Sequence, residues 1–145
     1  MSSEGCVFCR IVRGEIPSRK VFEDDSTLAM LDVSPLAPGH ILVVPKIHFE
    51  RVEDLSPEIS NALFSTVQRL TGPVRRSVNA HALTIGINDG REAGQVVPHV
   101  HIHIIPRDRN DGGGTIHSIM SRRPRLSEDD MARIAEKILK EDSSS

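Results

Sequence analysis

The sequence predicts an α+β fold in which one long helix packs on an antiparallel sheet, with a further helix near the C-terminus. Two observations carry this prediction. Short apolar runs separated by turn residues recur along the chain, and the segment from Ser56 to Val78 has the apolar spacing of a helix. With 145 residues, the chain is long enough for one domain with a core of its own.

The first elements are a short helix and a hairpin. Residues 6–14 predict a helix that Gly14 ends, and residues 18–24 and 27–33 predict two strands joined by the turn "EDDS". After the loop "PLAPG", the segment "HILVVPK" predicts a buried strand that stops at Pro45.

The long helix has clear start signals. Ser56 is a favourable N-cap, Pro57 suits the first helical position and Glu58 complements the helix dipole. Its apolar stripe comprises Ile59, Leu63, Val67, Leu70, Val74 and Val78. The stripe continues through Gly72-Pro73, so we expect one helix, kinked where Pro73 removes a backbone hydrogen bond.

The second half of the chain predicts two more strands and a helix. Residues 81–88 and 99–106 predict strands on either side of a loop, and residues 107–115 are polar and expected to be mobile. A C-terminal helix begins after Ser127 and bears Met131, Ile134 and Ile138. We expect one domain over 1–145, with its core at about 6–109 and a mobile loop and helix over 110–140.

Composition excludes several classes of protein. A formal net charge of −2 and a pI near 6.4 argue against a nucleic-acid partner, as does the absence of Trp and Tyr. The sequence shows no apolar run that could span a membrane and no signal peptide at its start. We therefore expect a cytoplasmic protein without a membrane partner, in which Cys6 and Cys9 have a purpose other than a structural disulfide.

Three histidines stand at alternate positions in "HVHIHII". In a strand, His99, His101 and His103 share one face while Val100 and Ile102 point into the core. One histidine on a strand is usually structural. Three in register favour a site that holds a metal, delivers a nucleophile or moves protons. The other strand-end and loop histidines, His40, His81 and His117, show no partner pattern and are interpreted as structural or exposed.

The loop before these histidines contains Asn88, Gly90, Gly94 and Gln95. Glycine backbone can approach an anion closely and Gln95 can donate from its amide, which indicates a phosphate cradle, although turns also use glycine for conformational reasons. No P-loop motif occurs. Asp32, at the end of a predicted strand, suits two ribose hydroxyls, but it is equally typical of a turn cap.

Cys6-x-x-Cys9 indicates half of a zinc site or a redox pair. The redox interpretation lacks a thioredoxin-like βαβ context. A structural zinc needs two further ligands, for which His48 and one histidine of the triad are candidates. A pair of free thiols is the alternative.

These motifs resemble the histidine triad (HIT) family of nucleotide hydrolases and transferases. The stretch "HVHIHII" is similar to the family signature at every position, and "FCRIVRGEIPSRKVFEDD", "LAMLDVSPLAPGHILVVPK" and "GINDGREAGQ" resemble its other characteristic stretches in the same order. The resemblance covers roughly residues 6–109. It implies a five-stranded antiparallel sheet with two helices and a two-fold homodimer.

The resemblance also implies roles for individual residues. His101 corresponds to the nucleophile that attacks the α-phosphate, with His99 and His103 as its flanking partners. The implied nucleotide-binding residues are Asn88, Gly94 and Gln95 in the phosphate loop, Asp32 for the ribose, and Val7, Phe8, Ile11, Met30 and Val33 for the base. The implied ligands of a structural zinc are Cys6, Cys9, His48 and His99, as in some microbial members.

One position departs from the family. Many relatives have Ser or Thr where this chain has Val96, so protonation of the leaving group would fall to His103 or Gln95, or only good leaving groups would be handled. The expected activity is hydrolysis of a purine nucleoside phosphoramidate or adenylate through a covalent nucleotidyl-histidine. The alternatives are a dinucleoside polyphosphate hydrolase or phosphorylase, a zinc hydrolase with His101 as a ligand, and a nucleotide-binding adaptor with little turnover.

Overall fold

The computed structural model describes residues 3–144. The chain divides after Asp111 into two compact units, Met1–Asp111 and Gly112–Ser145, and each is described by itself. The first unit contains the sheet, two helices and every residue of the predicted site.

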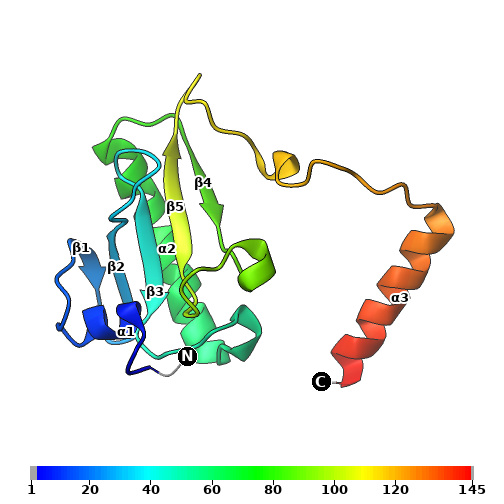
Figure 1. The fold of residues 1–145 in the computed structure, drawn as a ribbon, viewed down its shortest axis with the longest axis horizontal. Helices are drawn as coiled ribbons and strands as arrows, with labels where there is room; N and C mark the ends of the chain where they lie inside the picture. Colours follow the sequence, from blue (N-terminus) through cyan, green and yellow to red (C-terminus); the bar gives the residue numbers. More distant parts are fainter. Residues whose placement is uncertain (1–2, 145) are drawn as a thin grey trace. The chain divides into compact units, whose positions relative to one another are not determined.

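The sheet has five antiparallel strands in the order β1-β2-β3-β5-β4 (Figure 1). Its strands are β1 (Lys20–Glu23), β2 (Thr27–Leu31), β3 (Ile41–Pro45), β4 (Ala82–Gly86) and β5 (Ile102–Arg107). Helix α1 (Val7–Val12) precedes the sheet, and α2 (Pro57–Ser77) lies between β3 and β4 in the chain. The predicted α+β class and antiparallel sheet are confirmed.

Apolar side chains fill both faces of the central strands. Ala29, Val43 and Ile102 pack with the α2 stripe on one face, whereas Met30 and Leu42 pack with α1 on the other. Because neighbouring residues of a strand point to opposite faces, strands buried on both sides are apolar at nearly every position. This explains the uninterrupted runs "LAM" in β2 and "ILVV" in β3.

Helix α2 follows the sequence prediction closely. Ser56 caps it, since its hydroxyl oxygen accepts from the Ile59 backbone N–H at 3.3 Å, and Pro57 occupies the first turn. The helix continues as one element through Pro73 to Ser77. Leu63, Val67, Leu70 and Val74 of the predicted stripe are buried against the sheet.

Strand β5 begins three residues later than predicted, at Ile102 rather than His99. The register pairs Ile102 with Val43, so continuing the ladder toward His99 would bring Val100 opposite Pro45. Proline has no N–H to give to a ladder. The Val100 N–H donates instead to the Phe49 carbonyl at 2.7 Å, which holds this stretch beside the loop after β3.

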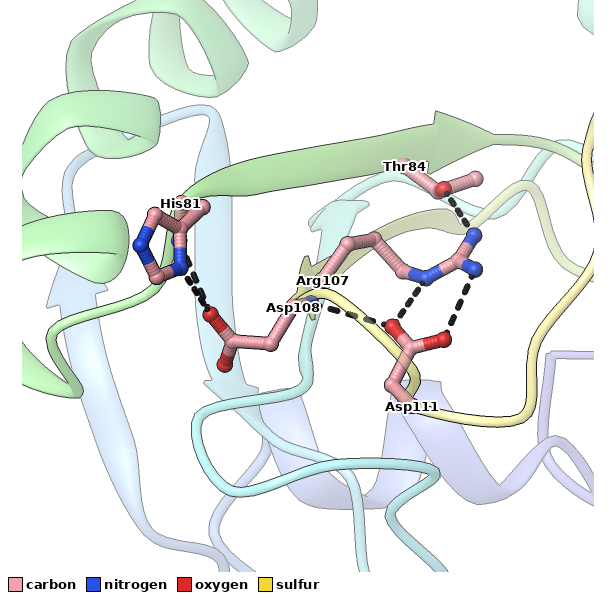
Figure 2. A network of polar contacts seen from close by, with 5 residues as sticks. All are labelled: His81, Thr84, Arg107, Asp108 and Asp111. Atoms are coloured by element: carbon pink, nitrogen blue, oxygen red, sulfur yellow. Dashed lines mark hydrogen bonds and ion pairs between the residues drawn. The ribbon is translucent and has the colours of Figure 1, made fainter.

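A polar network ties the end of β5 to β4 (Figure 2). Arg107 donates to Thr84 Oγ1 at 2.9 Å and makes two bonds to the Asp111 carboxylate at 2.7 and 3.0 Å. His81, before β4, lies 2.6 Å from Asp108 Oδ1 through its Nδ1. His81 was expected to be either structural or exposed, and its side chain is exposed.

The second unit contains helix α3 (Glu128–Ser144), close to the predicted C-terminal helix. The Ser127 hydroxyl accepts from the Asp130 N–H at 3.0 Å, and the Asp130 carboxylate accepts from the Ser127 N–H at 3.0 Å. The predicted apolar residues of α3 are exposed. None of the helices within residues 3–144 combines the length and the apolar run needed to cross a bilayer.

Candidate active site and metal centre

The first predicted cluster comes together between α1, β3 and the segment before β5. His99 Nδ1 lies 3.4 Å from Cys6 Sγ, 3.5 Å from Cys9 Sγ and 3.2 Å from His48 Nδ1, and Cys9 Sγ lies 3.4 Å from His48 Nδ1. The four ligand atoms all lie within 4.8 Å of one another. Residues from positions 6, 9, 48 and 99 therefore form one compact donor set.

Four of the six separations within this set fit a tetrahedral metal site. Zinc bonds of the usual length place sulfur and nitrogen ligands about 3.6 Å apart and two nitrogen ligands about 3.3 Å apart. The observed separations agree with both values. The other ring nitrogen of His99 donates to the Pro45 carbonyl oxygen at 2.8 Å, so the proton sits on Nε2 and the Nδ1 lone pair faces the cysteines.

Burial shifts the pKa of two of these groups, Cys9 and His99. It raises the pKa of the Cys9 thiol to about 11, with the neighbouring Cys6 adding to the effect, and it lowers the pKa of His99 to about 4. A neutral imidazole is the form that binds metal. The thiols would lose their protons on metal binding, because a thiolate is the ligand.

The middle histidine has a fixed tautomer. His101 Nδ1 lies 2.7 Å from the His99 backbone carbonyl oxygen, and because that oxygen only accepts, Nδ1 carries the proton. Nε2 of the neutral ring then holds a lone pair. The ring packs beside Phe8, with centroids 5.1 Å apart, and beside His103 at 5.2 Å.

The third histidine is oriented by a residue outside the triad. The Leu36 backbone N–H donates to His40 Nδ1 at 3.0 Å, which leaves the His40 proton on Nε2. His40 Nε2 lies 2.9 Å from His103 Nδ1 and donates to it, so His103 keeps its own proton on Nε2. Nε2 of His103 is thus a hydrogen-bond donor that the backbone fixes through His40.

This chain of hydrogen bonds stays uncharged near neutral pH. Burial, together with the neighbouring His101 and His40, lowers the pKa of His103 to about 4. Burial also lowers the pKa of His40, although the Asp32 carboxylate, 3.4 Å away, acts in the opposite direction. Asp32, His40 and His103 are close enough together to hold a cation, but His40 Nε2 carries a proton and has no lone pair for one.

His40 is the residue that sequence reasoning missed. The sequence indicated a structural or exposed residue. With 2% of its surface exposed, His40 fits the first alternative, but no pattern indicated its contact with His103. Its only signal was its position at the start of "HILVVPK". That signal acquires meaning once β3 and β5 are known to be neighbours. His117 is exposed in the second unit.

Asp32 lies at the end of β2, next to the hydrogen bond between His40 and His103. Its Oδ1 accepts from the Ser34 N–H at 2.8 Å and so caps a turn, as one of the two interpretations expected. Its Oδ2 lies 3.4 Å from His40 Nε2. The residue also lines a surface pocket of about 640 Å³, together with Pro17, Ser18, Arg19, Leu31, Val33 and Pro35.

The predicted base-binding residues divide between two environments. Phe8, Ile11 and Met30 belong to the buried cluster between α1 and the sheet, and Val7 is partly exposed on the same helix. Val33 is 95% exposed and lines the pocket that contains Asp32. Phe8, the aromatic residue among the five, packs its ring against the triad, with centroids 5.7 Å from His99 and 5.1 Å from His101.

The predicted phosphate loop is folded back on itself. Gly90 and Gly94 both have positive φ, at 105° and 98°, and an added Cβ at Gly94 would meet the Asn88 amide at 3.5 Å. Gln95 Oε1 accepts from the Gly90 N–H at 2.7 Å, and its Nε2 donates to the Glu50 carbonyl at 2.8 Å. The amide of Gln95 therefore closes the loop and keeps one N–H for other partners.

The profile of the HIT domain family matches residues 13–110. Adenylylsulfatase HINT3 of Arabidopsis thaliana is 42% identical over 106 residues, which cover 73% of this chain. The chain spans 54% of that relative's length. Adenosine 5′-monophosphoramidase HNT1 of Candida albicans is 36% identical over 110 residues, covering 73% of this chain and 72% of the relative.

The chain belongs to the HIT family. The crystal structure of a HIT family member from Bacillus subtilis is 36% identical, with a TM-score of 0.84, and the match covers 94% of this chain and 96% of that one. A zinc-bound histidine triad protein from Mycobacterium smegmatis is 33% identical with a TM-score of 0.69, over 99% and 100% of the two chains. The HIT fold predicted from the sequence is therefore confirmed.

Proposed function

We propose that this HIT protein is a hydrolase that acts on the α-phosphate of a purine nucleoside phosphoramidate or adenylate. Its nucleophile is His101. The observation that carries the proposal is the 2.7 Å bond from His101 Nδ1 to the His99 carbonyl, because it leaves the lone pair of Nε2 available for attack. The names of two relatives, an adenylylsulfatase and a monophosphoramidase, support an adenylate substrate.

The reaction proceeds in two displacements. His101 Nε2 attacks the α-phosphorus, and the leaving group departs with the electron pair of its bond to phosphorus, which gives a nucleotidyl-histidine. An adenylate releases its leaving group as an oxyanion, whereas the amine of a phosphoramidate takes a proton from water as it leaves. A water molecule then displaces His101, gives up a proton to solvent and releases the nucleoside monophosphate. His103 Nε2–H, held by His40, donates to a phosphate oxygen in both steps. Asn88, Gly94 and Gln95 contribute the phosphate loop, Asp32 the ribose acceptor, and Val7, Phe8, Ile11, Met30 and Val33 the apolar base site.

A structural zinc accompanies this site. The proposed ligands are Cys6, Cys9, His48 and His99. The zinc-bound histidine triad protein from Mycobacterium smegmatis supports this choice of metal. When bound, the ion joins α1 to the segment that carries the triad. His101 is left out of the ligand set, since its Nδ1 is engaged with a carbonyl and its ring contacts Phe8 and His103.

The proposal is tested by trapping the covalent intermediate. Wild-type protein mixed with radiolabelled adenylate and quenched in alkali should carry label on His101, because a phosphorus–nitrogen bond to histidine survives base better than acid. His101→Ala should lose the label and reduce turnover by about 10⁴-fold or more, the scale on which loss of a nucleophile acts. Its zinc content should stay at the wild-type level.

A matched variant separates the two histidines. His99→Ala should lower zinc content and thermal stability, with activity falling as a consequence. Loss of zinc from His101→Ala with retention in His99→Ala would favour a zinc hydrolase instead. Nucleotide binding without turnover by the wild type would favour an adaptor.

A further inference from the structure

A second pocket lies immediately before the triad in the chain. It has a volume of about 580 Å³ and is lined by Glu50, Arg51, Arg91, Gly94, Gln95, Val96 and Pro98. Two of these residues belong to the proposed phosphate loop, and Pro98 directly precedes His99. The site proposed above leaves the remainder of this lining unused.

The pocket is dominated by two guanidinium groups. Arg51 lies over Gly90, where an added Cβ would come within 2.7 Å of its Nη1. Arg91 follows Gly90 in the chain at the start of a short 3₁₀ turn. Within residues 3–144, neither guanidinium forms a hydrogen bond or ion pair, and Arg51 interacts electrostatically with the Glu50 carboxylate of the same lining. With one carboxylate, from Glu50, the lining has a formal charge of +1 and two unused bidentate donors.

The same lining offers no ready acid to protonate a leaving group. Its one carboxyl group, that of Glu50, is exposed and ionised near neutral pH, so it has no proton to give. Arginine stays charged at any pH of interest and gives up no proton. Val96 is an apolar residue with 89% of its surface exposed, and Pro98 and Gly94 have no side-chain donor. The backbone N–H groups and the amide of Gln95 donate hydrogen bonds but not protons, so Gln95 is not the acid that the sequence allowed for. The other candidate, His103, directs its Nε2–H to a phosphate oxygen in the site proposed above.

A pocket that binds negative charge but does not protonate suits one kind of leaving group. Sulfate, phosphate and carboxylate leave as stable oxyanions, whereas an amine must gain a proton before its bond to phosphorus breaks. Resting on the function proposed above, we infer that Arg51 and Arg91 bind the leaving group. The favoured substrates are then mixed anhydrides of a nucleoside monophosphate with an oxyacid.

The step balances without an added acid. As His101 Nε2 forms its bond to the α-phosphorus, the bond from phosphorus to the bridging oxygen breaks. The electron pair leaves on the oxyanion, and the two guanidiniums stabilise the charge that develops there. Water supplies the oxygen of the monophosphate in the second displacement and releases its proton to solvent.

The test compares two substrates that share one nucleotide. For adenosine 5′-phosphosulfate and adenosine 5′-phosphoramidate, kcat/KM is measured on wild type, Arg91→Ala, Arg91→Lys and the control Arg75→Ala, at an exposed arginine of α2. Arg91→Ala should lower the value for the phosphosulfate by about tenfold or more, as expected for a lost charge-assisted hydrogen bond. The value for the phosphoramidate should change less than about twofold on the same reasoning.

Further outcomes fix the interpretation. Arg91→Lys should recover part of the loss, and Arg75→Ala should match the wild type on both substrates. Equal losses on both substrates, or none on either, would overturn the role of the arginines. So would a wild-type preference for the phosphoramidate. Each of these results leaves the proposed hydrolase intact, provided that label still appears on His101. Absence of labelled His101 with either substrate would instead overturn the proposed function itself.

Discussion

His40 shows how a side chain outside the triad controls the proton positions within it. Its Nδ1 accepts from the Leu36 N–H, so its Nε2 must donate to His103 Nδ1. Without this donor, the neutral ring of His103 could hold its proton on either nitrogen, and only one of the two tautomers donates toward a phosphate.

We predict that His40→Ala lowers kcat about tenfold or more, because loss of a buried hydrogen bond worth roughly 1.5 kcal/mol acts on that scale. Steady-state kinetics would check this. KM should change little, and metal analysis should find the wild-type zinc content. His81→Ala is the matched control, since His81 pairs with Asp108 at the other end of β5 and should leave kcat unchanged. An unchanged kcat in His40→Ala would remove the positioning role.

Single residues differed in how far the sequence could predict them. The alternating pattern of residues 99–103 was enough to predict which side chains point into the core and which point away from it. Val100 and Ile102 are in the core, and the histidines face the other way. The role of His40 depends on the pairing of β3 with β5, which are separated by some 60 positions in the chain. No local pattern encodes a contact of that range.

At the scale of elements, helix α1 depends on its contacts with the rest of the sheet unit to stay folded. It has six residues, too few to form a stable helix alone in water. Phe8, Cys9 and Ile11 are buried against the sheet, and Cys6 and Cys9 face His48 and His99. The proposed metal would therefore supply part of the free energy that keeps α1 folded.

We predict that removing metal with a chelator loosens α1 before the rest of the unit. Amide hydrogen exchange over residues 7–12 should accelerate by about tenfold or more, because local opening costs less free energy once the ligands are released. The core of α2, including Leu63 and Val67, should keep its protection and serves as the internal control. Equal acceleration in both helices would mean that the metal supports the whole unit rather than α1.

Element boundaries were harder to predict than element types. The five strands and α2 were predicted from apolar pattern and capping residues, and the helix continues through Pro73 as its stripe indicated. The start of β5 was predicted three residues early, because the alternating pattern of its side chains extends beyond the hydrogen-bonded ladder. The partner that ends the ladder, Pro45, belongs to a different strand.

At the scale of the whole molecule, the two edges of the sheet differ in character. Edge strand β1 has a register shift between Lys20 and Phe22, and its Glu23 pairs with Lys20 and Lys46. Bulges and charges of this kind keep a strand edge from pairing with another chain. The opposite edge, β4, reads "ALTIG", contains no charge and leaves Ile85 42% exposed.

We therefore predict a homodimer in which β4 contributes the contact. Light scattering at micromolar concentration should give twice the 16.0 kDa mass of one chain. An obligate interface buries on the order of 2,000 Å² or more, and a contact of that size keeps the dimer together at this concentration. Ile85→Glu should shift the mass to that of the monomer, because a dimer would bury its carboxylate at the interface. Val21→Glu is the matched control on β1, where residue 21 is equally half exposed, and its mass should remain that of the dimer.

A wild type that scatters as a monomer would refute the dimer. A dimer that persists in Ile85→Glu but dissociates in Val21→Glu would move the contact to the charged edge, against the argument from strand composition.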